Sequence, residues 1–86
     1  MAEASKTGPA QLQVILERVD PARNVARYYV LSIEPTLFAR DTLVRRWGRI
    51  GRDGGRRLEF FDTERAAGLA LETWLARKRR RGYAVR

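Results

Sequence analysis

The stretch TLVRRWGRIGRDGGRRLEFF, from Thr42 to Phe61, contains the pattern that decides the fold. Its first half has the period of a strand with two different faces: Leu43, Arg45, Trp47 and Arg49 share one face, and Val44, Arg46, Gly48 and Ile50 share the other. The glycine-rich run Gly51 to Gly55 follows and holds an Asp-Gly pair, a strong signal for a tight turn between antiparallel strands. We therefore predict one strand from Thr42 to Ile50 and a returning strand from Arg57 to Phe61.

Two further strands are predicted on the N-terminal side of this hairpin. Apolar and polar residues alternate from Gln11 onward and again from Arg27 to Glu34, a period of two that suits strands with one face turned inward. Between them, Asp20 to Asn24 supplies turn residues, and Asn24 tolerates a left-handed backbone. Residues 1–10 hold almost no large apolar side chains and are predicted to be a disordered tail. The inward-facing residues are expected to be Leu12, Val14, Leu16, Tyr29, Leu31 and Ile33.

A single helix is predicted after the fourth strand. Either Asp62 or Thr63 can cap its N-terminus, and Glu64 suits the positive end of the helix dipole. The basic run Arg77 to Arg81 suits the negative end, and Gly82 stands where a left-handed cap is expected. The apolar stripe consists of Ala67, Ala70, Leu71, Trp74 and Leu75. The fold class is therefore α+β: a small twisted antiparallel sheet of about four strands with one C-terminal helix packed on one face. A single domain is expected over residues 11–86.

The amino-acid composition argues against several classes of function. The chain of 86 residues has no Cys and no His, which argues against disulfides, thiol or imidazole chemistry and the usual zinc ligands. We expect no metal, no cofactor and no enzymatic activity, since no set of catalytic residues is recognisable. The first residues lack the apolar stretch of a signal peptide, and no run reaches the ~18 apolar residues of a membrane helix. A cytoplasmic monomer without membrane contact is expected.

Charge is distributed unevenly along the chain. The net charge is +8, and residues 1–43 contribute nothing to it because five basic side chains balance five acidic ones. Residues 44–86 hold 13 basic against 5 acidic side chains, so they carry the whole excess. A GC-rich genome would account for 16 Arg against 2 Lys, but not for the asymmetry. A polyanionic partner is the better explanation.

The predicted third strand has one face suited to nucleic acid. Arg45, Trp47 and Arg49 fall on the same side of it, where an indole could stack on a base or sugar while guanidinium groups hold phosphates. Two alternatives stay open for Trp47, a stacking surface or a core residue, although a dry core would not accept two arginines without paired acids. Trp74 is expected to be core. The candidate binding residues are Arg45, Trp47, Arg49, Arg52, Arg56, Lys78 and Arg79.

The run Arg46-Trp47-Gly48-Arg49-Ile50-Gly51 resembles the signature of the WGR domain family, found in poly(ADP-ribose) polymerases and in small bacterial proteins. Other features that the family shows follow in order over Leu12 to Tyr83. They are Tyr28-Tyr29, Gly55, Phe60-Phe61, Ala66-Ala67, Trp74, Lys78 and Gly82-Tyr83. One departure is Arg56, where the family often has Gln. The resemblance implies an antiparallel sheet with one helix, and in the polymerases a role in contacting broken DNA and neighbouring domains.

These observations favour a nucleic-acid-binding module, with DNA ahead of RNA. The alternative is a protein-interaction module that binds an acidic partner, because Arg and Trp are also common interface anchors. The 86 residues contain no polymerase domain, so a role in sensing DNA breaks would rest on analogy alone.

Overall fold

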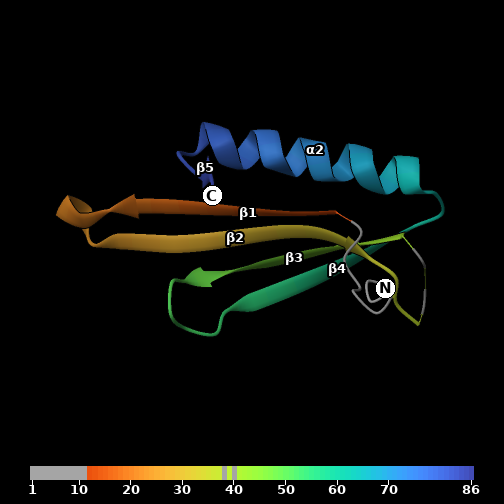
Figure 1. Ribbon diagram of the computed structural model, residues 1–86, viewed down its shortest axis with the longest axis horizontal. Coiled ribbons are helices and arrows are strands. Elements are labelled where there is room, and N and C mark those ends of the chain that lie inside the picture. The colour runs from red at the N-terminus through yellow and green to blue at the C-terminus, as the bar shows by residue number, and fades with distance from the viewer. Residues whose placement is uncertain (1–11, 38, 40) are drawn as a thin grey trace, which may run out of the picture.

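The computed structural model describes residues 12–37, 39 and 41–86 and has the predicted α+β fold. A five-stranded sheet has the order β4-β3-β2-β1-β5, all neighbours are antiparallel, and one helix lies along one face (Figure 1). The elements are β1 (Leu12–Asp20), the 3-10 turn η1 (Pro21–Arg23), β2 (Val25–Glu34), β3 (Asp41–Arg49), β4 (Gly55–Phe61), α2 (Glu64–Arg80) and β5 (Ala84–Val85). The predicted tail, residues 1–10, lies outside the described residues.

The structure adds one short strand to those predicted and confirms the predicted turn residue. The sequence predicts about four strands, whereas the structure adds the two-residue β5, which pairs Val85 with Leu16 of β1. This pairing depends on the chain reversing after the helix, which no local pattern in two residues can reveal. Asn24 adopts the left-handed conformation predicted for it, with φ of 56°, and closes the turn between β1 and β2.

The ends of α2 are fixed by two local motifs. The Ala66 N–H donates to Oγ1 of Thr63 over 3.0 Å, so Thr63 and not Asp62 is the N-cap. At the other end Gly82 has φ of 96°, as predicted, and its N–H donates to the Arg79 carbonyl over 3.0 Å. The Tyr83 N–H donates to the Lys78 carbonyl over 3.1 Å, which completes a Schellman motif. This motif turns the chain back toward β1.

The core lies between α2 and the face of the sheet that the helix covers. The buried apolar side chains of this core are Leu16, Tyr29, Leu31, Ile33, Leu43, Ala67 and Leu71. Along β3 this same face passes from buried Leu43 to Arg45, Trp47 and Arg49 as the strand approaches its hairpin turn. The apolar core therefore gives way to basic and aromatic side chains at the end of the molecule where both hairpin turns and the C-terminus lie (Figure 1).

Candidate functional site

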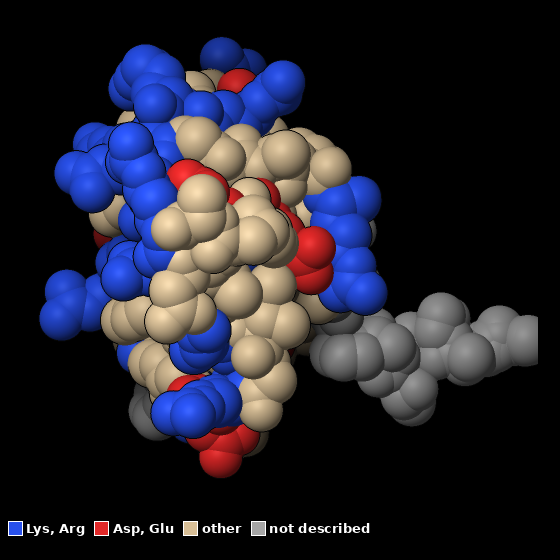
Figure 2. Space-filling view, turned by 90° about the vertical axis from the view of Figure 1, so that its left-hand side faces the viewer, with Lys and Arg blue, Asp and Glu red and all other residues tan. Residues whose placement is uncertain are grey.

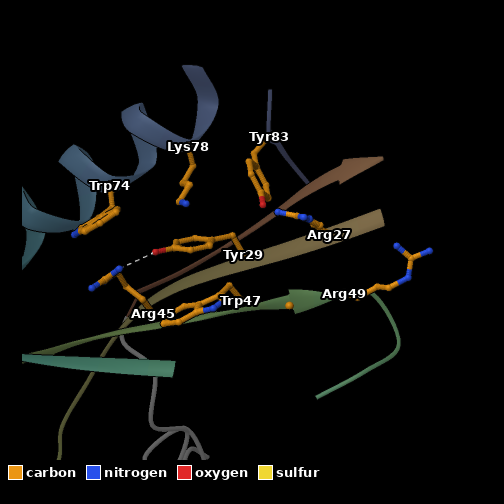
Figure 3. A pocket seen from close by; sticks show the side chains of 9 residues that line it. Arg27, Tyr29, Arg45, Trp47, Arg49, Trp74, Lys78 and Tyr83 are labelled. Carbon is orange, nitrogen blue, oxygen red and sulfur yellow. Dashed lines mark hydrogen bonds between the residues drawn. The ribbon is translucent and has the colours of Figure 1, made fainter. Parts of the chain in front are cut away.

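An open cavity of about 540 Å³ lies where the C-terminal half of α2 overhangs this end of the sheet. Side chains from β2, β3, α2 and the segment after the helix surround it, and most of them point toward one another, whereas Arg49 extends away from the others (Figure 3). It is lined by Arg27, Tyr29, Arg45, Trp47, Gly48, Arg49, Trp74, Lys78 and Tyr83. Four of these side chains are basic, four are aromatic, and none is acidic.

Strand register brings the sheet residues of the cavity together. Tyr29 lies opposite Trp47, and Arg27 lies opposite Arg49, in the pairing of β2 with β3. Directly opposed residues of antiparallel strands project to the same face about 5 Å apart. Arg27, Tyr29, Trp47 and Arg49 therefore project from the same side of the sheet, and the Arg49 guanidinium extends away from the two rings toward Asn24 (Figure 3).

The indole of Trp47 is neither fully buried nor free. Its ring is stacked with Tyr29, with centroids 6.1 Å apart and planes at 18°. It also lies so close over Gly55 that a Cβ there would be 2.8 Å from Cζ2 of the indole. The residue still exposes 37% of its surface. Contacts with both neighbouring strands, β2 and β4, thus hold the ring in place, and part of it stays accessible at the cavity.

Arg45, one of the predicted binding residues, is largely buried at the cavity, because its side chain is only 11% exposed. The guanidinium carbon lies 3.9 Å from the centre of the Trp74 ring, and Nη1 donates to the Tyr29 hydroxyl over 3.1 Å. Nε lies 3.9 Å from Oε1 of Glu59, which is beyond hydrogen-bond distance, and among the described residues neither of these two buried atoms has a hydrogen-bond partner. Arg45 therefore lines the cavity mainly as a support for the aromatic rings.

Arg49 is exposed and is held in position by the β1–β2 turn. Its Nη1 donates to the Asn24 carbonyl over 3.2 Å, and its Nη2 donates to the Asn24 side-chain oxygen over 3.1 Å. Neither acceptor is a carboxylate, so the positive charge is oriented but not neutralised. Arg27, opposite it, has no acidic partner within the described part of the chain.

Lys78 reaches into the cavity from α2. Its Nζ lies 4.4 Å from the centre of the Tyr29 ring and 5.7 Å from that of Tyr83. Burial lowers the pKa of the Lys78 amine, and the charges of Arg81, Arg45, Arg77 and Arg27 lower it further. No carboxylate among the described residues pairs with this amine. The surroundings thus favour an anion beside Lys78.

The remaining residues predicted for the site lie outside the cavity. Arg52 is exposed in the β3–β4 turn. Arg56 lies opposite Arg46 on the face of the sheet away from Arg45, because successive residues of a strand alternate between faces. Arg79 is exposed on α2. Seen from this end of the molecule, Lys and Arg side chains gather densely along one side (Figure 2).

Five lining residues were not among the predicted site residues: Arg27, Tyr29, Gly48, Trp74 and Tyr83. Trp74 does pack against the core, as predicted, but it also forms a wall of the cavity between Arg45 and Arg77. The spacing of Trp74 and Lys78, four residues apart on a helix, was a usable signal that both face the same way. Arg27 gave no such signal, because its nearness to Arg49 depends on strand register.

No group of three or more His, Cys, Asp or Glu side chains in the described part of the chain is placed to hold a metal ion. Among the same residues, no helix has both the length and the apolar character needed to cross a membrane.

Comparison with known proteins places the chain in a family. The chain is 46% identical over 74 residues to the uncharacterized protein y4dW of Sinorhizobium fredii. The aligned part is 86% of this chain and 36% of that protein, so the chain spans about a third of the relative's length. No solved structure matches it. The family model of the WGR domain matches residues 12–86, and the chain therefore belongs to the WGR domain family.

Proposed function

We propose that this protein is a nucleic-acid-binding module that holds one strand against the cavity beneath α2, with DNA preferred to RNA. WGR domains are in general associated with nucleic-acid binding. The preference for DNA follows the family resemblance, because the WGR domains of the polymerases contact DNA. A cytoplasmic location and a monomeric state are part of the same proposal.

One observation carries the proposal: four basic and four aromatic side chains surround one open cavity that no acidic side chain lines. Phosphates and bases alternate along a strand, and a binding surface for it needs cations and flat rings close together. A site for a simple anion would not need the rings, and a site for an apolar ligand would not need unpaired cations.

The roles of the lining residues differ according to their contacts. Trp47 offers the accessible ring for stacking, whereas Arg27, Arg49 and Lys78 offer charges that have no acidic partner among the described residues. Arg45 and Tyr29 position the rings through their mutual hydrogen bond. Because Asn24 already orders Arg49, less side-chain entropy is lost on binding.

The three predicted residues outside the cavity are proposed as secondary contacts. Arg52 lies in the turn that follows Arg49, where it can meet the phosphate next to the one that Arg49 holds. Arg56 and Arg79 lie on other surfaces and would be reached only by a longer duplex. Their removal should weaken binding less than removal of Arg27 or Arg49.

The test is a binding titration with fluorescent duplex and single-stranded oligonucleotides of one sequence, as DNA and as RNA. The variant Arg27→Ala/Arg49→Ala removes two unpaired cavity charges, and the matched control is the same protein with Arg65→Ala, an exposed arginine in the first turn of α2. We expect the double variant to lose affinity strongly and the control to bind as the parent does. Binding no tighter than about 1 mM at low salt, which is weaker than ordinary non-specific association with Kd of about 10⁻⁴ to 10⁻⁶ M, would overturn the proposal. If an acidic peptide bound the cavity instead, the protein-interaction alternative would replace it.

A further inference from the structure

Lys78 is the only primary amine among the residues that line the cavity. The chain contains two lysines, Lys6 and Lys78, among 18 basic residues, so nearly every other cation is a guanidinium group. Phosphate binding alone does not require this difference, since Arg holds phosphate at least as well as Lys. A guanidinium group, however, cannot act as a nucleophile at neutral pH, whereas a neutral amine can.

The surroundings of the Lys78 amine favour its action as a nucleophile. Figure 3 shows the side chain descending from α2 into the cavity between Trp74 and Tyr83. Nζ lies above the Tyr29 ring at 4.4 Å, and no acidic side chain of the described residues holds it as an ammonium ion. Lysine amines become nucleophilic when they are desolvated or placed beside other cations.

The direction of the pKa shift agrees with this geometry. Burial is the largest cause, followed by the charges of neighbouring arginines, and both lower the pKa of Lys78 from its usual value. A lower pKa leaves more of the amine neutral at a given pH, which raises the concentration of the reactive form.

We propose that Lys78 forms a reversible imine with the aldehyde of an abasic deoxyribose in a DNA strand held at this cavity. This inference rests on the proposed function. The ring-opened sugar of an abasic nucleotide presents an aldehyde, and this nucleotide lacks the base that would otherwise fill the cavity. Arg27 and Arg49 would hold its flanking phosphates, and Trp47 would stack on the adjoining base.

The step needs no reactant besides water. The nitrogen lone pair of Lys78 attacks C1′ of the open sugar, the C=O π electrons pass to oxygen, and a proton moves from nitrogen to oxygen to give a carbinolamine. Loss of the hydroxyl as water then forms the C=N bond. Addition of water reverses the sequence and restores both amine and aldehyde, so nothing is oxidised or reduced.

The test uses the full chain and a duplex with one abasic site, treated with sodium cyanoborohydride to reduce any imine to a stable amine. A duplex with a tetrahydrofuran analogue at that position has no aldehyde and measures binding alone. Each variant is used at a concentration that saturates the analogue duplex. We expect a covalent adduct on a denaturing gel for the parent and for Lys6→Arg, and its loss in Lys78→Arg, which keeps the charge.

Peptide mapping of the parent adduct by mass spectrometry locates the modified amine and does not depend on how any variant folds. Modification at Lys78 supports the inference. Modification at Lys6 or at the N-terminal amine, or an undiminished adduct in Lys78→Arg, overturns it. Binding of the analogue without any adduct from the abasic duplex also overturns it and leaves the proposed function standing. If the protein binds neither the analogue duplex nor an intact duplex, both the inference about Lys78 and the proposed function are wrong.

Discussion

The salt dependence of DNA binding should change in steps as the unpaired cations of the cavity are removed. Within the described part of the chain, the cavity offers three charges without acidic partners, from Arg27, Arg49 and Lys78, and one that lies beside an acid, from Arg45. Each phosphate contact releases condensed counterions from the DNA, so log K falls linearly with log salt in proportion to the number of contacts. Arg49→Ala should therefore flatten this line by one contact.

The expected change can be worked out from the number of contacts removed. One contact corresponds to ~0.9 in the slope for duplex and ~0.7 for single strand. Raising the salt from 50 to 200 mM weakens binding by the parent and by the Arg49→Ala variant. With a slope change of ~0.9, the variant's fold-loss of affinity should be about 3.5 times smaller than the parent's. Removing Arg27 as well doubles the slope change. The double variant's fold-loss of affinity over the same salt range should then be about 12 times smaller than the parent's.

Fluorescence anisotropy at four or five salt concentrations measures these slopes, with Arg65→Ala as the control for loss of one exposed charge. Trp47→Ala separates stacking from charge, because it should cost ~1–3 kcal/mol of binding and leave the slope unchanged. Each variant must melt cooperatively for the comparison to hold. An Arg49→Ala slope equal to that of the parent, or a slope change as large in Arg65→Ala, would refute the assignment of phosphate contacts to the cavity.

Four further predictions concern the residues that shape the site. Gly82→Val should destabilise the domain by about 1 kcal/mol or more, because a β-branched residue is penalised at the observed φ of 96°, and calorimetry should show a melting temperature lower by about 4–8 °C. Gly55→Ala should displace the indole of Trp47, which a Cβ would meet at 2.8 Å, and so change tryptophan emission and remove part of the ~1–3 kcal/mol of stacking. Arg45→Met should cost about 1–2 kcal/mol in chemical denaturation, because a nearby carboxylate and a tyrosine hydroxyl lose their partner, while the salt slope stays unchanged. Deletion of residues 1–10 should leave both the cooperative melt and the affinity intact.

Each of these predictions has an outcome that contradicts it. An unchanged melting temperature for Gly82→Val would mean that the Schellman motif is not needed to end α2. If the Gly55→Ala variant kept the tryptophan emission and the DNA affinity of the parent, the indole of Trp47 would not lie over the β4 backbone. A flatter salt slope in Arg45→Met would make that arginine a phosphate contact after all. Loss of cooperative unfolding on deletion of residues 1–10 would show that this segment contributes to the fold.

The secondary structure could be predicted from the sequence because its signals are local. The alternation of apolar residues in β2 depends only on neighbours in the chain, and so do the capping position near Thr63 and the left-handed glycine at 82. The shared face of Arg45, Trp47 and Arg49 follows from the strand period of two. The sequence therefore determined the fold class, the side of β3 that carries the candidate site and the excess positive charge of the second half.

Only the tertiary structure decided which residues meet at the site and which of them carry an unpaired charge. Strand register places Arg27 opposite Arg49, and the position of α2 over the sheet brings Lys78 to the Tyr29 ring. The same packing buries Arg45 beside an acid from β4 and leaves Arg56 on the far face. The physical reason is that these contacts join segments far apart in the chain. A periodic pattern fixes the face of each element but not its alignment with the next, which depends on how all the elements pack around one core.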